Sequence, residues 1–95
     1  MPKDIYEVRL IALAGGRKIR VELLENHQVS RRAVAPRGDQ VKKTIDKVLK
    51  ASKLEFTSVT DLLVECEEGS SMLSCQMIKA ARDTFVFARA VSTKN

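Results

Sequence analysis

The adjacent glycines Gly15 and Gly16 limit the fold of this chain more than any other feature. They separate two β-prone runs, residues 5–14 (IYEVRLIALA) and residues 17–25 (RKIRVELLE). Because glycine has no Cβ atom, both residues can take the positive φ angles of a two-residue hairpin turn. The sequence therefore predicts an N-terminal β-hairpin.

With both glycines in the turn, the register of the hairpin follows. Arg9 lies directly opposite Glu22, which predicts an ion pair across the strands. One face of the hairpin is apolar and carries Tyr6, Val8, Leu10, Ala12, Ile19, Val21 and Leu23. The other face is mixed, and its apolar residues, which we expect to be exposed, are Ile11, Leu13 and Leu24.

An irregular segment follows the hairpin. Residues 26–38 (NHQVSRRAVAPRG) show no periodic pattern and contain Asn, Ser, Pro and Gly, a composition typical of loops. We expect a long loop that carries Arg31, Arg32 and Arg37. A short strand over residues 29–35 is the alternative for its middle part.

An amphipathic helix is predicted over residues 39–53. Asp39 follows Gly38 and suits the N-cap position, where a carboxylate accepts hydrogen bonds from free backbone N–H groups. The apolar face has helical spacing and consists of Val41, Ile45, Val48 and Leu49. The reverse face carries a lysine stripe: Lys43, Lys47 and Lys50.

Two further elements complete the predicted fold. Residues 58–66 alternate in part, which indicates a third strand, and residues 70–91 favour one long helix over a helix followed by a fourth strand at residues 84–87. The apolar stripe of this helix is Leu73, Met77, Ala81, Phe85 and Ala88. The sequence thus predicts a single α+β domain over residues 1–95, in the order ββαβα with an extra C-terminal strand as the alternative. Its small, mainly antiparallel sheet, made of the hairpin and the third strand, has both helices packed on one face.

Residues for metal binding or catalysis are few. His27 is the one histidine, and Cys66 and Cys75 stand nine positions apart without a CxxC motif. We therefore expect no metal site, no cofactor and no enzymatic activity. The first residues do not resemble a secretory signal and no apolar run approaches the roughly 18 residues of a membrane span, so we expect a cytoplasmic protein with reduced thiols and no membrane contact.

The charge is distributed unevenly along the chain. Residues 1–53 hold thirteen Lys and Arg against six Asp and Glu, whereas residues 54–95 hold four against six, within a formal net charge of +5. A basic half of this kind is typical of proteins that bind polyanions.

This basic half leads to the functional prediction. We expect a small intracellular, non-enzymatic module that binds the backbone of DNA or RNA. The residues expected to contact phosphates are Lys18, Arg20, Arg31, Arg32, Arg37, Lys43, Lys47 and Lys50. An acidic protein partner is the alternative, and an ordinary solvated lysine surface would give the same pattern.

Self-association is a separate expectation. The chain has more apolar residues than one core accounts for, and a homodimer could bury them. Besides those on the mixed hairpin face, the surplus residues are Met72, Ile78, Val86 and Phe87.

Overall fold

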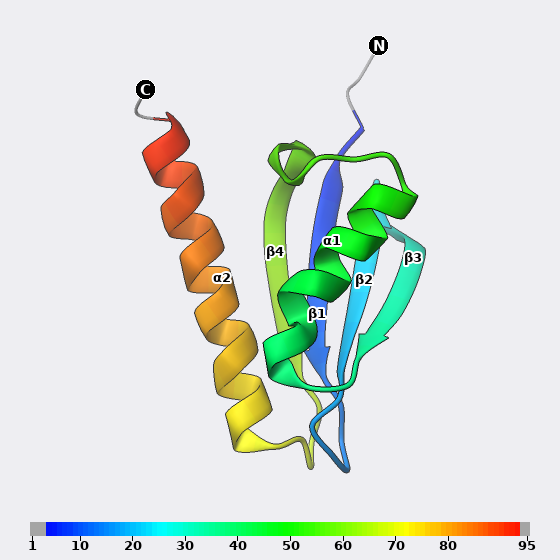
Figure 1. Cartoon of the computed structure of the whole chain (residues 1–95), viewed down its shortest axis with the longest axis vertical. Coiled ribbons are helices and arrows are strands. Elements are labelled where there is room, and N and C mark those ends of the chain that lie inside the picture. Colours follow the sequence, from blue (N-terminus) through cyan, green and yellow to red (C-terminus); the bar gives the residue numbers. More distant parts are fainter. Residues whose placement is uncertain (1–3, 94–95) are drawn as a thin grey trace.

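The elements of the protein follow the order βββαβα (Figure 1). The computed structural model describes residues 4–93, with side chains described as far as Phe85. The strands are β1 (Tyr6–Ala12), β2 (Ile19–Glu25), β3 (Gln28–Ala35) and β4 (Val59–Cys66). The helices are α1 (Val41–Ala51) and α2 (Met72–Thr93), and short 3₁₀ turns at Gly38–Gln40 and Phe56–Ser58 precede α1 and β4.

The four strands form one mixed sheet in the order β3-β2-β1-β4. β1 pairs antiparallel with β2, β2 antiparallel with β3, and β4 parallel with β1. The α+β class is confirmed, but the predicted mainly antiparallel sheet and the order ββαβα are wrong. The parallel pairing arises because β3 runs in the same direction as β1, and the chain then returns through α1 before β4 begins, as parallel neighbours require.

The N-terminal hairpin has the predicted register. Arg9 pairs with Glu22. Of the two turn glycines only Gly15 has a positive φ, +81°, so the expected turn with both glycines at positive φ is wrong. The apolar face of the hairpin is the centre of the core, where six residues are fully buried: Val8, Leu10, Ala12, Ile19, Val21 and Leu23. Ile11 and Leu24, expected to be exposed on the other face, are only 6% and 4% exposed, so this part of the argument for self-association is wrong.

The predicted loop over residues 26–38 is wrong for most of its length, and the alternative strand is correct. β3 follows β2 through a two-residue turn in which Asn26 and His27 both have positive φ angles, 53° and 70°. Asn tolerates this conformation better than most residues, so Asn26 favours a turn at this position. Arg31 and Arg32 therefore lie on a strand, and of the three loop arginines only Arg37 lies outside a regular element.

Both helices pack against the apolar face of the sheet and share one core with it. The buried face of α1 is the predicted one: Val41, Ile45, Val48 and Leu49. The helix begins two residues later than expected, and Asp39 does not cap it. Instead Asp39 lies within the 3₁₀ turn that precedes the helix, and its carboxylate lies 3.4 Å from Nε of Arg37.

The single long C-terminal helix is confirmed, and Phe85 of its predicted stripe is buried, but in the first turns the buried positions are shifted by one residue. Ile78 is fully buried, whereas Leu73 is 53% exposed. The small side chain of Ser74 lets the first turns of α2 approach the hairpin, and its hydroxyl donates to the Arg17 carbonyl at 3.5 Å. The expected stripe residue Ala88 and the surplus residues Val86 and Phe87 lie outside the described side chains.

A disulfide bond joins Cys66, the last residue of β4, to Cys75 in the first turn of α2. The expectation of reduced thiols is therefore wrong. The chain reverses over residues 67–71, where Gly69 has a φ of +85°, and this brings the two Cα atoms to 5.7 Å, within the range that a disulfide spans. Across residues 4–93, no helix is long and apolar enough to cross a membrane.

Candidate functional site

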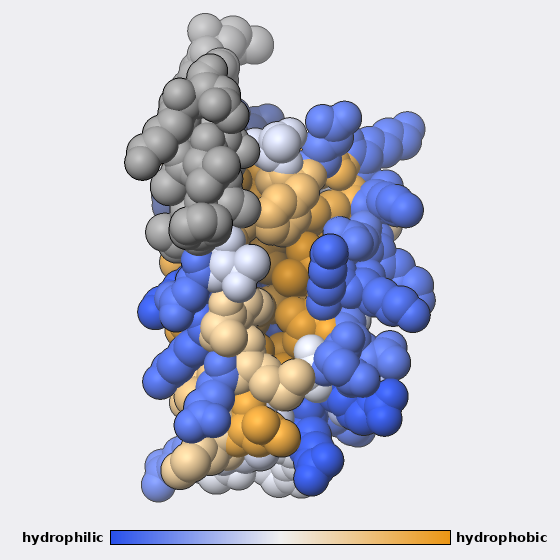
Figure 2. All heavy atoms as spheres, turned by 60° about the vertical axis from the view of Figure 1, so that its left-hand side comes forward, coloured by the Kyte–Doolittle hydropathy of each residue, from blue (hydrophilic) through white to orange (hydrophobic). Residues whose placement is uncertain are grey.

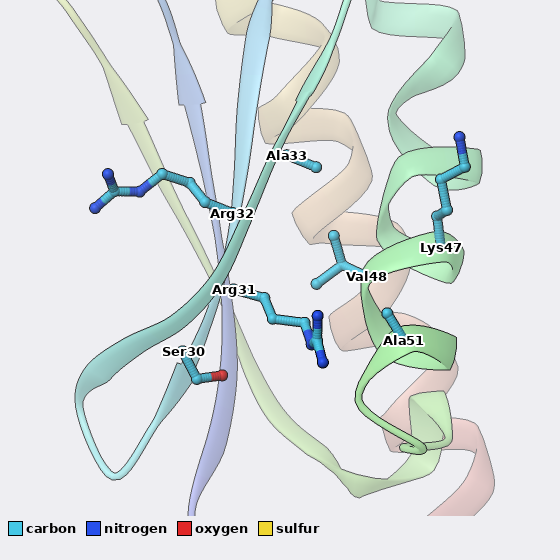
Figure 3. A pocket seen from close by; sticks show the side chains of 7 residues that line it. All are labelled: Ser30, Arg31, Arg32, Ala33, Lys47, Val48 and Ala51. Carbon is cyan, nitrogen blue, oxygen red and sulfur yellow. The ribbon is translucent and has the colours of Figure 1, made fainter.

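The eight cations predicted to bind phosphate do not form one patch. Successive residues of a strand point to opposite faces, so Arg31 points towards α1 and Arg32 away from it (Figure 3). Arg20 shares the open face of the sheet with Arg32, Lys18 lies beside the hairpin turn, and Arg37 lies beyond β3. On the side that α1 covers remain Arg31, Lys43, Lys47 and Lys50.

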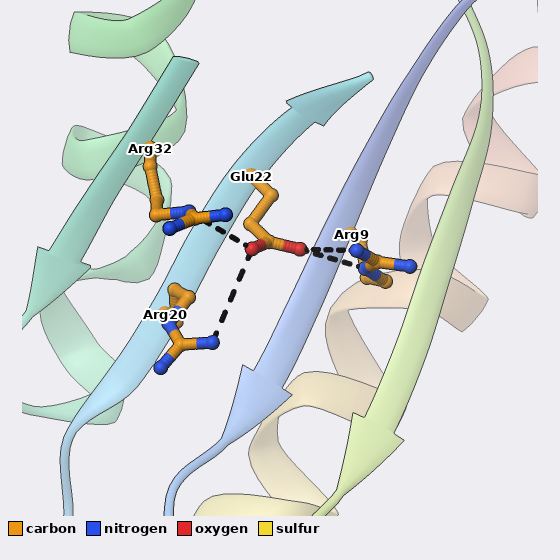
Figure 4. Close-up of polar contacts among 4 residues, drawn as sticks. All are labelled: Arg9, Arg20, Glu22 and Arg32. Carbon is orange, nitrogen blue, oxygen red and sulfur yellow. Dashed lines mark hydrogen bonds and ion pairs between the residues drawn. The ribbon is translucent and has the colours of Figure 1, made fainter. Parts of the chain in front are cut away.

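The open face of the sheet is organised around the buried carboxylate of Glu22 (Figure 4). Arg9 donates from Nε to Oε1 of Glu22 at 2.8 Å, and its Nη2 lies 2.6 Å from the same oxygen. Nε of Arg32 lies 3.2 Å from Oε2, and Nη1 of Arg20 lies 4.0 Å from it. Three guanidinium groups from three strands thus converge on a side chain that is only 3% exposed.

This cluster changes the role expected of two predicted site residues. Arg20 and Arg32 have a carboxylate partner, so their charge is partly neutralised within the fold. The cluster also explains why Ile11 and Leu24 are buried on a face without a helix, since long arginine side chains can cover neighbouring apolar residues with their methylene groups. The sequence predicted the Arg9–Glu22 pair but missed Arg32, because β3 was taken for a loop.

A groove separates β3 from α1 on the opposite side of the sheet (Figure 3). Its volume is about 350 Å³. Three small or apolar side chains contribute to its lining: Ala33, Val48 and Ala51. Arg31 and Lys47 border it from β3 and α1 respectively. The groove thus places positive charge around an apolar floor.

Arg31 is held in place over this groove. Its Nε donates to Oγ of Ser52, the residue that follows α1, at 2.7 Å. Its remaining N–H groups have no hydrogen bond or ion pair within the part of the chain that the structure describes. A guanidinium fixed through Nε still presents its two terminal nitrogens, which can bind a carboxylate or phosphate.

The lysines of α1 and its C-terminal turn form the largest unneutralised charge in the described residues. None of them lies within 4.0 Å of a carboxylate there, and they are Lys42, Lys43, Lys47, Lys50 and Lys53. Asp46 is the single acidic residue of α1. Lys47 lies with Arg31 beside the groove between β3 and α1, whereas Lys42 lines the groove on the other side of the helix. With no partner in the described residues, these lysines are available to an external anion.

A second groove lies between the two helices and is almost entirely apolar. Figure 2 shows a hydrophobic band there, bordered by hydrophilic side chains. The groove has a volume of about 510 Å³, and its apolar residues are Ile45, Phe56, Leu62, Ala81 and Phe85. The Phe56 ring is 42% exposed and meets Phe85 edge to face at 5.2 Å between centroids. The sequence did not indicate this groove, because it depends on how far apart the helices lie.

The candidate catalytic residues do not come together. His27 lies in the turn after β2, with its Nδ1 3.1 Å from Oε1 of Glu7. Cys66 lies at the other end of the sheet, beside Ala12, and its sulfur is bonded to that of Cys75. Within residues 4–93, no three His, Cys, Asp or Glu side chains are grouped closely enough to hold a metal ion.

Comparisons with protein-family models, with curated proteins and with solved structures find no match for this chain.

Proposed function

We propose that this protein is a non-enzymatic binding module that holds an acidic segment of a partner protein in the groove between β3 and α1. The observation that carries the proposal is the combination of an apolar floor with unneutralised cations on its rim. Arg31 and Lys47 border the groove, and Ala33, Val48 and Ala51 contribute its floor. A peptide that alternates acidic and apolar side chains matches both features.

Electrostatics favours an anionic partner at this surface. The lysines of α1 lie within a few helical turns of one another and face a single aspartate, so their potential adds rather than cancels. Such a surface attracts acidic partners over about 8–10 Å at physiological ionic strength and speeds their association. The binding should accordingly weaken as salt is added.

A protein segment fits the site better than the nucleic-acid backbone that the sequence suggested. A phosphate backbone needs cations but makes no use of an apolar floor. Four of the predicted phosphate contacts do not contribute to this free charge: Arg20 and Arg32 lie near Glu22, Arg37 lies 3.4 Å from Asp39, and Lys18 lies beside the hairpin turn. Nucleic-acid binding stays the alternative prediction, and it would use the lysine stripe of α1.

The proposal includes no catalytic step. Its support is that the described cysteine sulfurs are bonded to each other and that His27 lies beside Glu7, away from both of them. Neither described cysteine is therefore available beside that histidine as a thiolate, as acid–base activation of a thiol would require.

A charge-reversal experiment tests the proposed function. The probe is a blocked, fluorescent seven-residue peptide of alternating valine and glutamate, and the variant is Arg31→Glu with Lys47→Glu. The matched control, Arg17→Glu with Lys79→Glu, makes the same change in net charge at exposed positions away from the groove. We expect the groove variant to bind at least about tenfold more weakly than the control, since attraction at two sites becomes repulsion.

Competition with nucleic acid separates the two predictions. Duplex DNA or single-stranded RNA that binds more tightly than the peptide and displaces it would overturn the proposal. Nucleic-acid binding through about four phosphates would also show log K falling with log salt at a slope of about −3 to −4. Equal binding of the peptide to both double variants would likewise refute a site at the groove.

A further inference from the structure

We infer that the acidic segment binds by strand addition, as a fifth strand along the outer edge of β3. This inference rests on the proposed function and adds the mode of recognition, namely main-chain hydrogen bonds to the sheet. In β-strand addition such bonds give affinity, and the side chains that alternate along the new strand give specificity.

The outer edge of β3 is free for pairing. β3 is the terminal strand of the sheet and bonds on one side to β2. On its other side, no main-chain hydrogen bond connects it to another segment within the described residues. Every second residue of a regular edge strand directs its N–H and C=O groups outwards. A bulge at Ser30 interrupts this alternation, so β3 presents its regular row of donors and acceptors over residues 31–35.

The two edges of the sheet differ in what they offer. α2 runs beside β4, whereas residues 28–32 of β3 are exposed throughout (Figure 1). β4 also carries Asp61 and Glu65, which repel an acidic strand, whereas β3 carries Arg31 and Arg32. An acidic segment therefore binds at β3 rather than β4, because the edge of β3 is exposed and β3 carries positive charge.

The side chains on either side of β3 define the partner's sequence pattern. Arg31 and Ala33 pair with core-facing residues of β2 and so lie on the α1 side, while Arg32 and Val34 lie on the open face. A strand added beside β3 places every second side chain over the groove. An acidic side chain fits there against Arg31 and Lys47, and its methylene groups can cover Ala33.

The open-face positions of the added strand complete this pattern. The Val34 side chain is 50% exposed at the edge, and an apolar side chain of the partner would cover it. The recognised segment therefore has acidic residues at alternate positions on the groove side and at least one apolar residue on the other.

A second copy of this chain does not meet these requirements through β3 itself. Pairing β3 with β3 of another molecule would set two strands that each carry Arg31 and Arg32 side by side. Like charges on paired strands are destabilising, and charged residues on an edge strand are a known protection against such pairing. A strand that pairs with β3 must therefore carry negative charge, so we expect the occupant to be an acidic protein segment.

N-methylated peptides test strand addition without altering the protein. Two isomers of the valine–glutamate peptide carry N-methyl groups either on every glutamate or on every valine, so their charge and their number of methyl groups are closely matched. Whichever direction the added strand takes, one set of amides faces β3 and the other faces solvent. We expect one isomer to bind at least tenfold more weakly than the parent peptide and the other to bind within about threefold of it.

Hydrogen exchange of the unmodified protein supplies the second measurement. Binding of the parent peptide should slow the exchange of alternate main-chain amides of β3, at the positions that face away from β2. Parent binding that depends on Arg31 and Lys47, but is equally strong for both isomers and leaves β3 amides unchanged, would overturn strand addition while the proposed function stands. Failure of the parent peptide to bind would overturn both.

Discussion

Replacing Glu22 by glutamine should destabilise the fold more than any other single removal of charge from the described sheet. The carboxylate is 3% exposed, and a guanidinium nitrogen of Arg9 lies 2.6 Å from one of its oxygens. Guanidinium nitrogens of Arg32 and Arg20 lie 3.2 Å and 4.0 Å from the other oxygen. Glu22→Gln keeps the shape of the side chain but leaves three guanidinium groups around a neutral amide. The substitution therefore isolates the charge of the cluster from its packing.

The size of the effect can be worked from this geometry. Removing one partner of a fully buried ion pair costs about 3–5 kcal/mol. Here the arginine side chains are 28% to 61% exposed and can regain water, so the cost is lower. We expect the free energy of unfolding to fall by about 2–3 kcal/mol, which for a domain of this size corresponds to a decrease in Tm of roughly 10–20 °C.

Urea denaturation followed by circular dichroism measures this change. The matched control is Glu25→Gln, which makes the same substitution at the exposed end of β2, where no arginine lies within ion-pair distance in the described residues. We expect the control to change the free energy of unfolding by less than about 0.5 kcal/mol. If Glu22→Gln lost no more than this control, the three arginines would be as well solvated without the carboxylate, and the reasoning would be wrong.

Three other predictions concern α2 and β1. Ile78→Ala should lower the free energy of unfolding by about 2–5 kcal/mol and Leu73→Ala by less than about 1 kcal/mol, because only the Ile78 side chain is fully buried. Thermal denaturation that found Leu73→Ala the less stable variant would contradict the described stripe. Cys75→Ser should lower the free energy of unfolding by about 2.6 kcal/mol, because the unfolded chain regains the entropy that the disulfide removes by closing a nine-residue loop. Equal stabilities of the oxidised protein and the variant in urea denaturation would contradict this. Burial, and after it the charge of Asp4, raises the pKa of the Tyr6 phenol above its ordinary value. An ultraviolet titration should therefore show Tyr6 ionising at higher pH than free tyrosine, and at somewhat lower pH in Asp4→Asn than in the unmodified protein. Ionisation at the same pH as free tyrosine would contradict this cause.

Local signals in the sequence were sufficient for part of the fold. The adjacent glycines and the alternation of the flanking residues determined the register of the hairpin, including Arg9 opposite Glu22. The spacing of Val41, Ile45 and Val48 determined the buried face of α1. In each case the information lies within one continuous stretch of the chain, where turn chemistry and periodicity act directly.

Features that depend on distant contacts could not be predicted in this way. The parallel pairing of β4 follows from the return of the chain through α1. The disulfide follows from the reversal after β4, which brings Cys66 beside Cys75. The burial of Ser74 in place of Leu73 in the first turn of α2 depends on how the helix approaches the sheet. None of these has a local signature, because each is decided by which elements become neighbours in space.

The failure to predict β3 has a physical cause that also bears on the proposed function. β1 and β2 are recognisable because every second residue faces the core and is apolar, whereas an edge strand is mostly exposed and can be polar over much of its length. β3 is of this second kind, with Arg31 and Arg32 at its middle and exposed residues from Gln28 to Arg32. The absence of a hydrophobic pattern hid the strand in the sequence. The same exposure leaves its outer hydrogen-bonding groups open, so the segment with the weakest strand signal is the one on which recognition of a partner strand depends.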